Sequence, residues 1–546
     1  MKSESTQTWA LPLSGLRFLV IVLLLLGVFF RFANIDHKLY WHDEVYTTLR
    51  AAGFTGKEIG QEIFKNQIFS PQDLQKFQRL KAGSTVTDTL ESLAIEDPQH
   101  PPLYFLIARF WMQIFGSSIT ASRILPALLS LLSLPLMYAL GLELFASPLA
   151  ALFATTLLTV SPFDILFAQI ARQYSFLTFA VIASSFLLLR ALRLQTWQNW
   201  GLYTLATALG LYTHAFFCLT LMAQGVYILL LQFIDKSSRK PGEVERGENV
   251  DNSELTQNPK FKIHNPKFFL SVATALLLYS PWLIVLIANS KRALEVTSWS
   301  SGVVDVLLLL QLWTLSFTSL FLDLYFEFNL VLTYLLRLLI VLLIAAAIYT
   351  VCRRTSRKTW LFILTSIFVP FIMLALPDLL LGGKRSAVTR YLISCFPGVQ
   401  LAVAYFLATK IPDGQRIWRM IMALLVTGSI ASCTVSALSD TWWSNIPSYF
   451  NAEVARRINA DSSPLVLSDV GYDNTNLGDL ISLSYLLHND VRLLLLSQAP
   501  DLKLLPSNSN AFIFRPSEPL GKALQKEPGQ LKSVFPPGQL WQLQRS

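Results

Sequence analysis

Two neighbouring carboxylates, Asp43 and Glu44, are the first residues of this chain whose type and position suggest chemistry. They follow directly after the first long apolar segment, in the run Tyr40-Trp41-His42-Asp43-Glu44. Carboxylates beside a membrane span are costly unless water solvates them or a reaction uses them, for example to accept a proton. The alternative is structural, with Asp43 capping a helix over residues 44–52.

Further polar residues follow in short motifs between apolar segments. They occur in Gln99-His100-Pro101-Pro102-Leu103-Tyr104, in Ser122-Arg123-Ile124-Leu125-Pro126 and in Gln169-Ile170-Ala171-Arg172-Gln173-Tyr174-Ser175. A fourth group, Gly382-Gly383-Lys384-Arg385 with Arg390-Tyr391, lies much later in the chain. Arginine is suited to binding phosphate, because its planar fork of N–H groups grips two oxygens.

The composition excludes a water-soluble enzyme. Hydrophobic residues make up 53% of the 546 residues and charged residues only 14%, whereas a soluble protein carries about 25% charged residues. The chain is therefore expected to be an integral membrane protein. Its net charge of +9 fits basic cytoplasmic loops better than nucleic-acid binding. None of the four cysteines lies in a CxxC pair, which argues against zinc-thiolate or redox chemistry.

Apolar runs long enough to span a membrane determine the expected topology. They occur at 14–32, 121–145, 148–169, 173–193, 198–213, 215–233, 267–289, 328–351, 359–380, 392–409 and 417–438. Lys and Arg after several of these runs mark the cytoplasmic side. The resulting order leaves the runs 101–116 and 303–324 on the outer face as interfacial or re-entrant helices. We therefore predict a polytopic α-helical membrane protein with about 11 spanning helices.

Two hydrophilic regions then face outward. One is the first outer loop, residues 33–120, and the other is the tail, residues 440–546. The tail has a strand-like segment at 464–469, a helix-like segment at 477–487 and an apolar segment at 491–496, a pattern that indicates a small α/β domain. The expected organisation is a membrane domain over 1–439, with a cytoplasmic loop at 234–266, and an extracytoplasmic α/β domain over 440–546.

The outer basic loop, residues 381–391, contradicts the usual distribution of charge across a membrane. Lys384, Arg385 and Arg390 lie on the predicted outer face, although basic residues normally mark the inner one. They could snorkel to lipid headgroups, or the topology could be inverted. The functional alternative is a phosphate cradle in which Gly382 and Gly383 allow close approach of the backbone.

Taken in order, these motifs resemble those of the polyprenyl-phosphate-dependent glycosyltransferases of the GT-C fold. Within them, the chain is similar to the protein O-mannosyltransferase and aminoarabinose-transferase superfamily. The motifs concerned are the Asp-Glu pair, His-Pro-Pro-Leu-Tyr, Ser-Arg-x-x-Pro and Gln-x-Ala-Arg-x-Tyr-Ser, all within residues 1–235. The resemblance implies transfer of a sugar from a lipid-linked donor to an acceptor hydroxyl outside the cytoplasmic membrane.

The resemblance also implies roles for single residues. Asp43 takes the place of the general base and Glu44 that of its partner. Arg123 and Arg172 match the family's outward-facing arginines, and the Arg390-Tyr391 pair resembles a feature of its penultimate outer loop. With Lys384, Arg385 and Arg390 of the basic loop they are the expected donor-phosphate residues, and the expected substrate contacts are His100, Tyr104, Tyr174 and Tyr391. His100 and Gln99 stand where the aminoarabinose transferases carry a Lys and a metal-touching Glu. No cofactor is required by the motifs, although Asp97 and His214 could contribute to a divalent metal site.

The chemistry of the reaction agrees with these roles. A base within about 3 Å can take the acceptor proton as the nucleophile attacks C1, and one carboxylate suffices for an inverting displacement. The partners are a polyprenyl-phosphate sugar, a lipid, glycan or protein acceptor, and membrane lipids. The alternatives are a protein O-mannosyltransferase and a non-enzymatic transporter of lipid-linked saccharide. Trp299 and other tryptophans are expected to form an interfacial belt.

Overall fold

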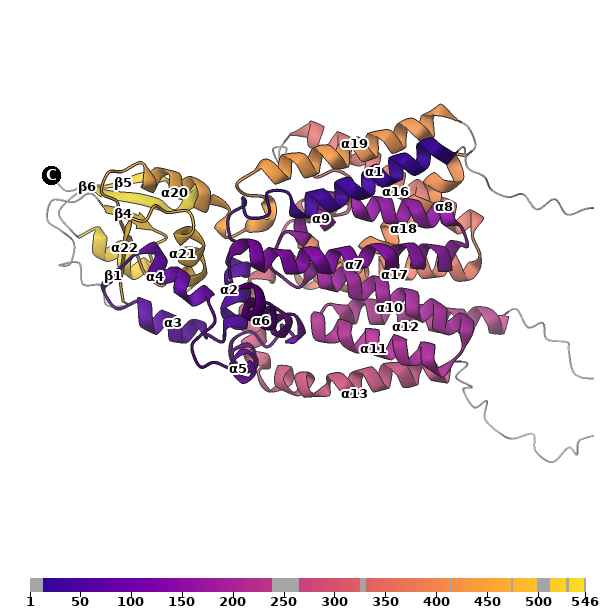
Figure 1. Ribbon diagram of the computed structural model, residues 1–546, viewed down its shortest axis with the longest axis horizontal. Coiled ribbons are helices and arrows are strands. Elements are labelled where there is room, and N and C mark those ends of the chain that lie inside the picture. Colours follow the sequence, from indigo (N-terminus) through magenta and orange to yellow (C-terminus); the bar gives the residue numbers. More distant parts are fainter. Residues whose placement is uncertain are drawn as a thin grey trace, which may run out of the picture.

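The computed structural model describes residues 13–237, 265–324, 330–412, 415–472, 475–497, 511–526 and 530–544. It shows a bundle of long helices with a cap of short helices and strands at one end (Figure 1). The cap is built from two parts of the chain, the first outer loop and the tail. The helices and strands that form the two regions have the following bounds.

Most helices of the bundle run along the long axis of the molecule (Figure 1). They are α1 (Leu13–Phe32), α7 (Ile119–Phe145), α8 (Pro148–Thr159), α9 (Pro162–Ala168), α10 (Tyr174–Leu194), α11 (Trp197–Thr213), α12 (Phe217–Ser237), α13 (Pro266–Ala288), α16 (Val331–Arg354), α17 (Arg357–Leu381), α18 (Phe396–Lys410) and α19 (Arg416–Leu438). Each of the eleven predicted spans contains one of these helices, and the run 148–169 contains both α8 and α9.

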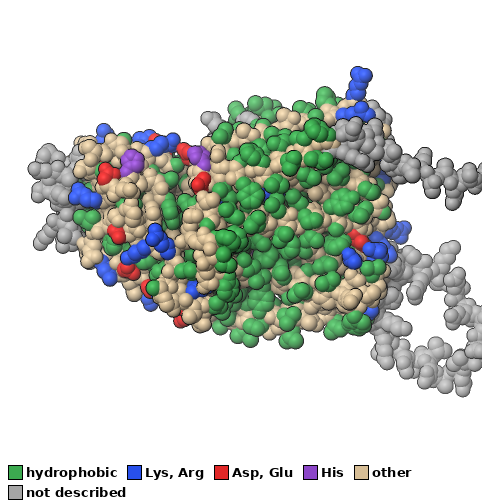
Figure 2. All heavy atoms as spheres, in the orientation of Figure 1, with side chains coloured by type: hydrophobic (Ala, Val, Ile, Leu, Met, Phe, Trp, Pro, Cys, Tyr) green, Lys and Arg blue, Asp and Glu red, His purple; other side chains and the backbone are tan. Residues whose placement is uncertain are grey.

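Six of these helices, α7, α10, α13, α16, α17 and α19, are long and apolar enough to cross a membrane by themselves. Helices α8 and α9 together make a seventh candidate, bent by 53° at the break before Pro162. Large hydrophobic side chains such as Leu277, Leu339 and Leu380 point outward, and Figure 2 shows hydrophobic side chains over most of this face of the bundle. An apolar surface of this extent requires lipid around it, so the chain is a multi-pass membrane protein.

The two apolar runs excluded from the span count form short helices. They are α6 (Leu103–Phe115) and α15 (Val306–Thr318), each of 13 residues. At 1.5 Å per residue, such a helix covers only about 20 Å of the roughly 30 Å hydrocarbon layer. Helix α6 begins directly after Pro101 and Pro102, as predicted. Between α13 and α15 lies a further short helix, α14 (Ser290–Thr297).

The cap contains one mixed sheet with the strand order β1-β3-β2-β4-β6-β5. Its elements are α2 (His42–Ala52), α3 (Gly56–Ile63), β1 (Gln67–Phe69), α4 (Pro71–Gln75), α5 (Val86–Glu96), α20 (Asn451–Asn459), β2 (Leu465–Ser468), α21 (Asn476–Ser484), β3 (Arg492–Leu495), β4 (Ala511–Phe514), α22 (Glu518–Leu524), β5 (Gln530–Phe535) and β6 (Leu540–Gln544). The α/β pattern predicted for the tail is confirmed. Strand β1 was not predicted: it comes from the first outer loop and pairs antiparallel with β3 of the tail.

Helix α2 carries both carboxylates, and Glu44 fixes it to the bundle. Glu44 is fully buried and accepts four hydrogen bonds, two from Arg123 at 2.7 and 2.8 Å and two from the backbone N–H groups of Trp41 and Ala171. Because Glu44 takes the Trp41 N–H, the helix begins at His42 with Trp41 as its N-cap. The alternative in which Asp43 caps the helix is therefore wrong, since Asp43 lies inside the first turn.

Arg123 is fully engaged in holding this region together. Besides Glu44, it donates to the carbonyl oxygens of Ile35, Lys38 and Leu39 at 2.8–3.0 Å. A guanidinium has five N–H groups, and these contacts use all five. One buried ion pair thus ties the end of α1, the start of α2, α7 and the connection between α9 and α10.

We predict that Arg123→Leu strongly destabilises the protein. Removing one partner of a buried ion pair leaves an uncompensated charge, which costs about 3–5 kcal/mol of the free energy of unfolding. Arg123→Lys should recover little, because an ammonium cannot replace the fork. Thermal unfolding in detergent measures the effect. As a control, Lys76→Ala removes an exposed 2.7 Å pair with Glu62 in the same outer loop and should cost about 0–1 kcal/mol. Equal melting temperatures for Arg123→Leu and this control would contradict the assignment.

Candidate active site

Asp43 lies between two arginines that are far apart in the sequence. Its Oδ2 atom is 3.9 Å from Arg172 Nη2 and 4.0 Å from Arg390 Nη2. The Asp43 side chain is 24% exposed, whereas its neighbour Glu44 is fully buried. The two adjacent carboxylates therefore have different surroundings. Glu44 is buried in an ion pair that holds the fold together, whereas Asp43 is partly exposed to solvent and lies beside two arginines.

Arg172 is held by residues from two parts of the first outer loop. Its Nη1 donates to Thr47 Oγ1 at 2.9 Å and to the Asp43 carbonyl oxygen at 3.3 Å, and its Nη2 lies 3.2 Å from His100 Nε2. Since arginine only donates hydrogen bonds, His100 Nε2 accepts. Burial and the charge of Arg172 lower the pKa of His100 well below its ordinary value, so the imidazole is neutral and orients the arginine.

Arg390 is surrounded by aromatic rings. Its guanidinium lies 5.3 Å from the ring centre of Trp41, 5.5 Å from Tyr391 and 5.7 Å from Trp299. Burial alone would lower the pKa of Arg390, but Tyr174 and Asp43 outweigh it and raise the pKa above its ordinary value. Arg390 is thus a permanent cation at the Asp43 carboxylate. Its Nε has no hydrogen-bond partner among the described residues.

The predicted substrate residues Tyr174 and Tyr391 belong to the same cluster. Tyr174 is buried and interacts with both Arg172 and Arg390. Burial raises the pKa of Tyr391 to about 12. The centre of its ring lies 4.3 Å from the ring centre of Phe216. His214 lies beside these residues. Its ring centre is 5.9 Å from that of Tyr174 and 6.2 Å from that of His100. We call Asp43, His100, Arg172, Tyr174 and Arg390 the Asp43 cluster.

Several predicted site residues have other partners. Arg123 and Glu44 neutralise each other. Arg385 donates to Ser301 Oγ at 2.7 Å and lies 3.6 Å from the buried carboxylate of Asp378, and we therefore assign it to the shape of its loop. The side chain of Lys384 lies 5.5 Å from the Trp299 ring centre, at the edge of the cluster.

Two further predicted residues are structural by their contacts. Tyr104 is buried in the packing between α6, α7 and α10, against Leu125 and Phe176. Asp97 is bonded to Arg50 Nε at 2.8 Å. Burial alone would raise the pKa of Asp97, but the charge and hydrogen bond of Arg50 lower it to about 2.

A metal site from Asp97 and His214 is not supported by this geometry. Asp97 is occupied by Arg50, and His214 Nδ1 accepts the backbone N–H of Phe216 at 3.1 Å. Within the described ranges, no group of three or more His, Cys, Asp or Glu side chains comes together as a metal-binding set. Asp97 and His214 are therefore assigned to the structure around the cluster.

Residues for which the sequence predicted no such role contact the Asp43 cluster. Thr47 holds Arg172, and Gln173 contacts His100 Nδ1 with its side-chain amide at 3.1 Å. Trp299 was assigned to an interfacial belt, but it lies over Arg390 and Lys384 while remaining 46% exposed. Trp41 and Trp299 flank a guanidinium, and only the folded structure brings these distant positions together.

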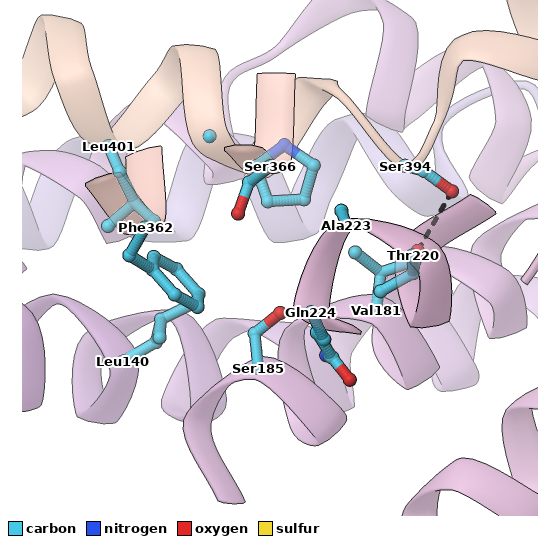
Figure 3. Close-up of a pocket in the computed structure, with 12 residues that line it drawn as sticks. Leu140, Val181, Ser185, Thr220, Ala223, Gln224, Phe362, Ser366, Ser394 and Leu401 are labelled. Atoms are coloured by element: carbon cyan, nitrogen blue, oxygen red, sulfur yellow. Dashed lines mark hydrogen bonds between the residues drawn. The ribbon is translucent and has the colours of Figure 1, made fainter. Parts of the chain in front are cut away.

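A pocket inside the bundle is lined by a different set of residues (Figure 3). Side chains from α7, α10, α12, α17 and α18 line it. Thr220 donates to Ser394 at 2.9 Å within it, the dashed contact in Figure 3. None of the residues that line it belongs to the Asp43 cluster. Ionisable groups, partial exposure and converging polar atoms instead place the candidate active site at Asp43.

This chain is similar to the model of one protein family and to several solved structures. Residues 99–243 match the model of the dolichyl-phosphate-mannose-protein mannosyltransferase family. ArnT from Cupriavidus metallidurans bound to undecaprenyl phosphate has 12% sequence identity and a TM-score of 0.55, covering 97% of this chain and 98% of ArnT. ArnT in the apo state gives a TM-score of 0.51 at the same identity and coverage.

The oligosaccharyltransferase of Archaeoglobus fulgidus matches with 12% identity and a TM-score of 0.46, over 88% of this chain and 64% of its own. No curated protein matches this chain at the level of sequence. The family model and the ArnT structures confirm the predicted resemblance to polyprenyl-phosphate-dependent glycosyltransferases, and the chain has the GT-C fold.

Proposed function

We propose that the protein is a glycosyltransferase that moves a sugar from a polyprenyl-phosphate donor to an acceptor hydroxyl, with inversion at C1. The observation that carries the proposal is the position of the Asp43 carboxylate, within about 4 Å of the guanidinium groups of both Arg172 and Arg390. In this reaction the acceptor hydroxyl loses a proton and the leaving phosphate gains negative charge. A base next to two cations can accept the proton and stabilise the phosphate. The GT-C fold and the undecaprenyl phosphate bound to ArnT support the class of donor.

The reaction proceeds in one displacement. The acceptor oxygen attacks C1 of the sugar, its proton passes to Asp43, and the bond between C1 and the phosphate oxygen breaks. The phosphate leaves with the polyprenyl chain and gains negative charge. Arg172 and Arg390 hold it, and their attraction grows as that charge develops, which lowers the barrier as well as the donor dissociation constant.

The same geometry gives an order to the steps. Without a donor phosphate, Asp43 is the anion nearest to both arginines. An arriving phosphate competes for the two guanidinium groups, and the Asp43 carboxylate is then released toward the acceptor. Donor binding therefore precedes activation of the base, so we expect an ordered mechanism in which the donor binds first.

The acceptor class is the second part of the proposal. The match of residues 99–243 to a protein mannosyltransferase model favours a protein hydroxyl as one candidate. Lipid and glycan hydroxyls would lose their proton to Asp43 by the same chemistry. A transfer assay with one polyprenyl-phosphate sugar and these three acceptor classes separates them. A transporter of lipid-linked saccharide would show no transfer in any of the three.

We predict that Asp43→Asn abolishes transfer but binds polyprenyl phosphate at least as tightly as the wild type. Loss of the general base lowers kcat by about 10²–10⁴. Loss of the competing carboxylate leaves both arginines free for the phosphate. Transfer kinetics measure the first effect, and equilibrium binding of labelled polyprenyl phosphate measures the second.

A matched variant for this test is Asp36→Asn. Asp36 lies in the same outer loop, where Thr120 donates to it at 3.1 Å, so its removal should leave kcat close to that of the wild type. Normal turnover in Asp43→Asn would exclude Asp43 as the base. Loss of lipid-phosphate binding in the same variant would exclude the competition between Asp43 and the phosphate.

Arg390 should affect both donor binding and turnover. We predict that Arg390→Ala raises the donor KM and also lowers kcat, because the contact strengthens as the leaving oxygen gains charge. Arg390→Lys should recover only part of the loss, since a point charge cannot grip two oxygens. Steady-state kinetics with varied donor at a fixed acceptor concentration give both constants.

The comparison variant is Arg385→Ala, which removes the same charge from the same loop. Because Arg385 is directed to Asp378 and Ser301, its loss should change the donor KM much less. Equal effects of the two variants would mean that the loop acts through its net charge, and the specific role of Arg390 would fail.

The proposal places the cap on the outer face of the membrane. The basic residues Arg353 and Arg354 end α16, and Arg357 and Lys358 begin α17, so the positive-inside rule assigns this end of the bundle to the cytoplasm. In a variant without the native cysteines, Ser462→Cys in the cap should react with a membrane-impermeant maleimide on intact spheroplasts. Lys358→Cys should react only after lysis, and the reverse pattern would invert the topology.

A further inference from the structure

The first turn of α2 is held by the tail as well as by Arg123. The backbone N–H of His42 donates to Ser448 Oγ at 3.1 Å, across 406 positions of sequence. The Ser448 hydroxyl donates its own proton to Asp479 Oδ1 at 2.6 Å. Ser448 and Asp479 are both fully buried. The direction of the two hydrogen bonds is fixed, because the single hydroxyl proton goes to the carboxylate and a lone pair accepts the His42 N–H.

This contact is a helix cap supplied by a distant segment. The first N–H groups of a helix have no partner within the helix and need an outside acceptor. Trp41 N–H is satisfied by Glu44, and His42 N–H is satisfied by Ser448. The indole of Trp41 also donates to the Ile446 carbonyl oxygen at 2.9 Å. Residues 446–448 therefore hold both residues that precede Asp43.

The fit between α21 and α2 leaves no space at this contact. A Cβ atom added to Gly478 would lie 2.6 Å from His42 Nδ1 and 2.8 Å from Tyr46 Cε2. The Oδ2 atom of the next residue, Asp479, lies 3.5 Å from His42 Nδ1 and forms an ion pair with Arg515. Pairing of β1 with β3 joins the same outer loop to the tail a second time. The first turn of α2 is thus clamped between Arg123 on the bundle side and the tail on the other.

We propose that Ser448 and Asp479 are positioning residues for the reaction: they cap α2 from the tail and so fix the Asp43 carboxylate against Arg172 and Arg390. The inference rests on the proposed function. Asp43 is the second residue of α2, and helix ends fray when their caps are lost. A displacement of about 1 Å at a reacting group can lower a rate by up to about 10².

The test is Ser448→Ala in the full-length protein. We expect kcat to fall about tenfold, while the dissociation constant for polyprenyl phosphate does not rise, because Ser448 contacts neither Arg172 nor Arg390 and a displaced Asp43 competes less for them. Amide hydrogen exchange in the first turn of α2 should become about five- to tenfold faster, the effect expected for one lost cap. Ser448→Thr keeps the hydroxyl and should restore most of both properties.

A matched control is available within the tail. Ser517 caps α22 and donates to the buried carboxylate of Asp469, so Ser517→Ala removes the same kind of contact without touching α2. It should leave exchange in α2 and kcat near their wild-type values. Equal exchange in α2 for Ser448→Ala and Ser517→Ala overturns the inference, as does a wild-type kcat in Ser448→Ala.

Failure of the proposed function can be told apart from failure of this inference. If Asp43→Asn retains turnover, the proposed function fails, and the exchange comparison still tests whether Ser448 caps α2. If Asp43→Asn is inactive and Ser448→Ala is fully active with unchanged exchange, only the positioning role fails.

Discussion

The buried ion pair of Glu44 and Arg123 is the constraint on which the candidate site depends. Two carboxylates that are adjacent in sequence must face different surroundings, and a helix turn separates neighbouring side chains by about 100°. Since Arg123 and two backbone N–H groups saturate Glu44 inside the protein, Asp43 is directed to the partly exposed side, where Arg172 and Arg390 lie.

The charges of the Asp43 cluster support the proposed lipid-phosphate donor. Arg172 and Arg390 contribute two positive charges, Asp43 contributes one negative charge, and His100 is neutral because burial and Arg172 lower its pKa. The net positive charge favours one more anion in a partly buried place where Coulomb attraction is stronger than in water. The aromatic rings around Arg390 give cation–π support without neutralising its charge.

Much of this arrangement was predictable from the sequence, and the exceptions have a physical reason. Hydropathy runs and charge placed the helices. The order of the motifs indicated Asp43, His100, Arg172 and Tyr174 as candidate site residues, and the outer basic loop indicated Arg390. Residue type does not show which arginine will form an ion pair with a buried carboxylate and so be unavailable to a substrate. Arg123 and Arg172 occur in similar motifs, yet all five N–H groups of Arg123 form hydrogen bonds within the protein.

The contributions of the tail were not predictable in the same way. Ser448 follows no motif, and its role depends on the burial of Asp479 and on the absence of a side chain at Gly478. Strand β1 has only three residues, too few to give a periodic signal, and it becomes a strand through its pairing with β3. Long-range contacts of this kind decide how the cap meets α2, whereas local sequence decides only that α2 is a helix.

The anomeric configuration of the product tests the central claim most directly. If Asp43 is the base, as proposed, then Glu44, which is locked in its ion pair with Arg123, cannot act as the second carboxylate of a double displacement, and the transfer is a single displacement. NMR of the transferred sugar, compared with the polyprenyl-phosphate donor, should show the opposite configuration at C1. Retention of configuration would be incompatible with a single displacement and would contradict this account.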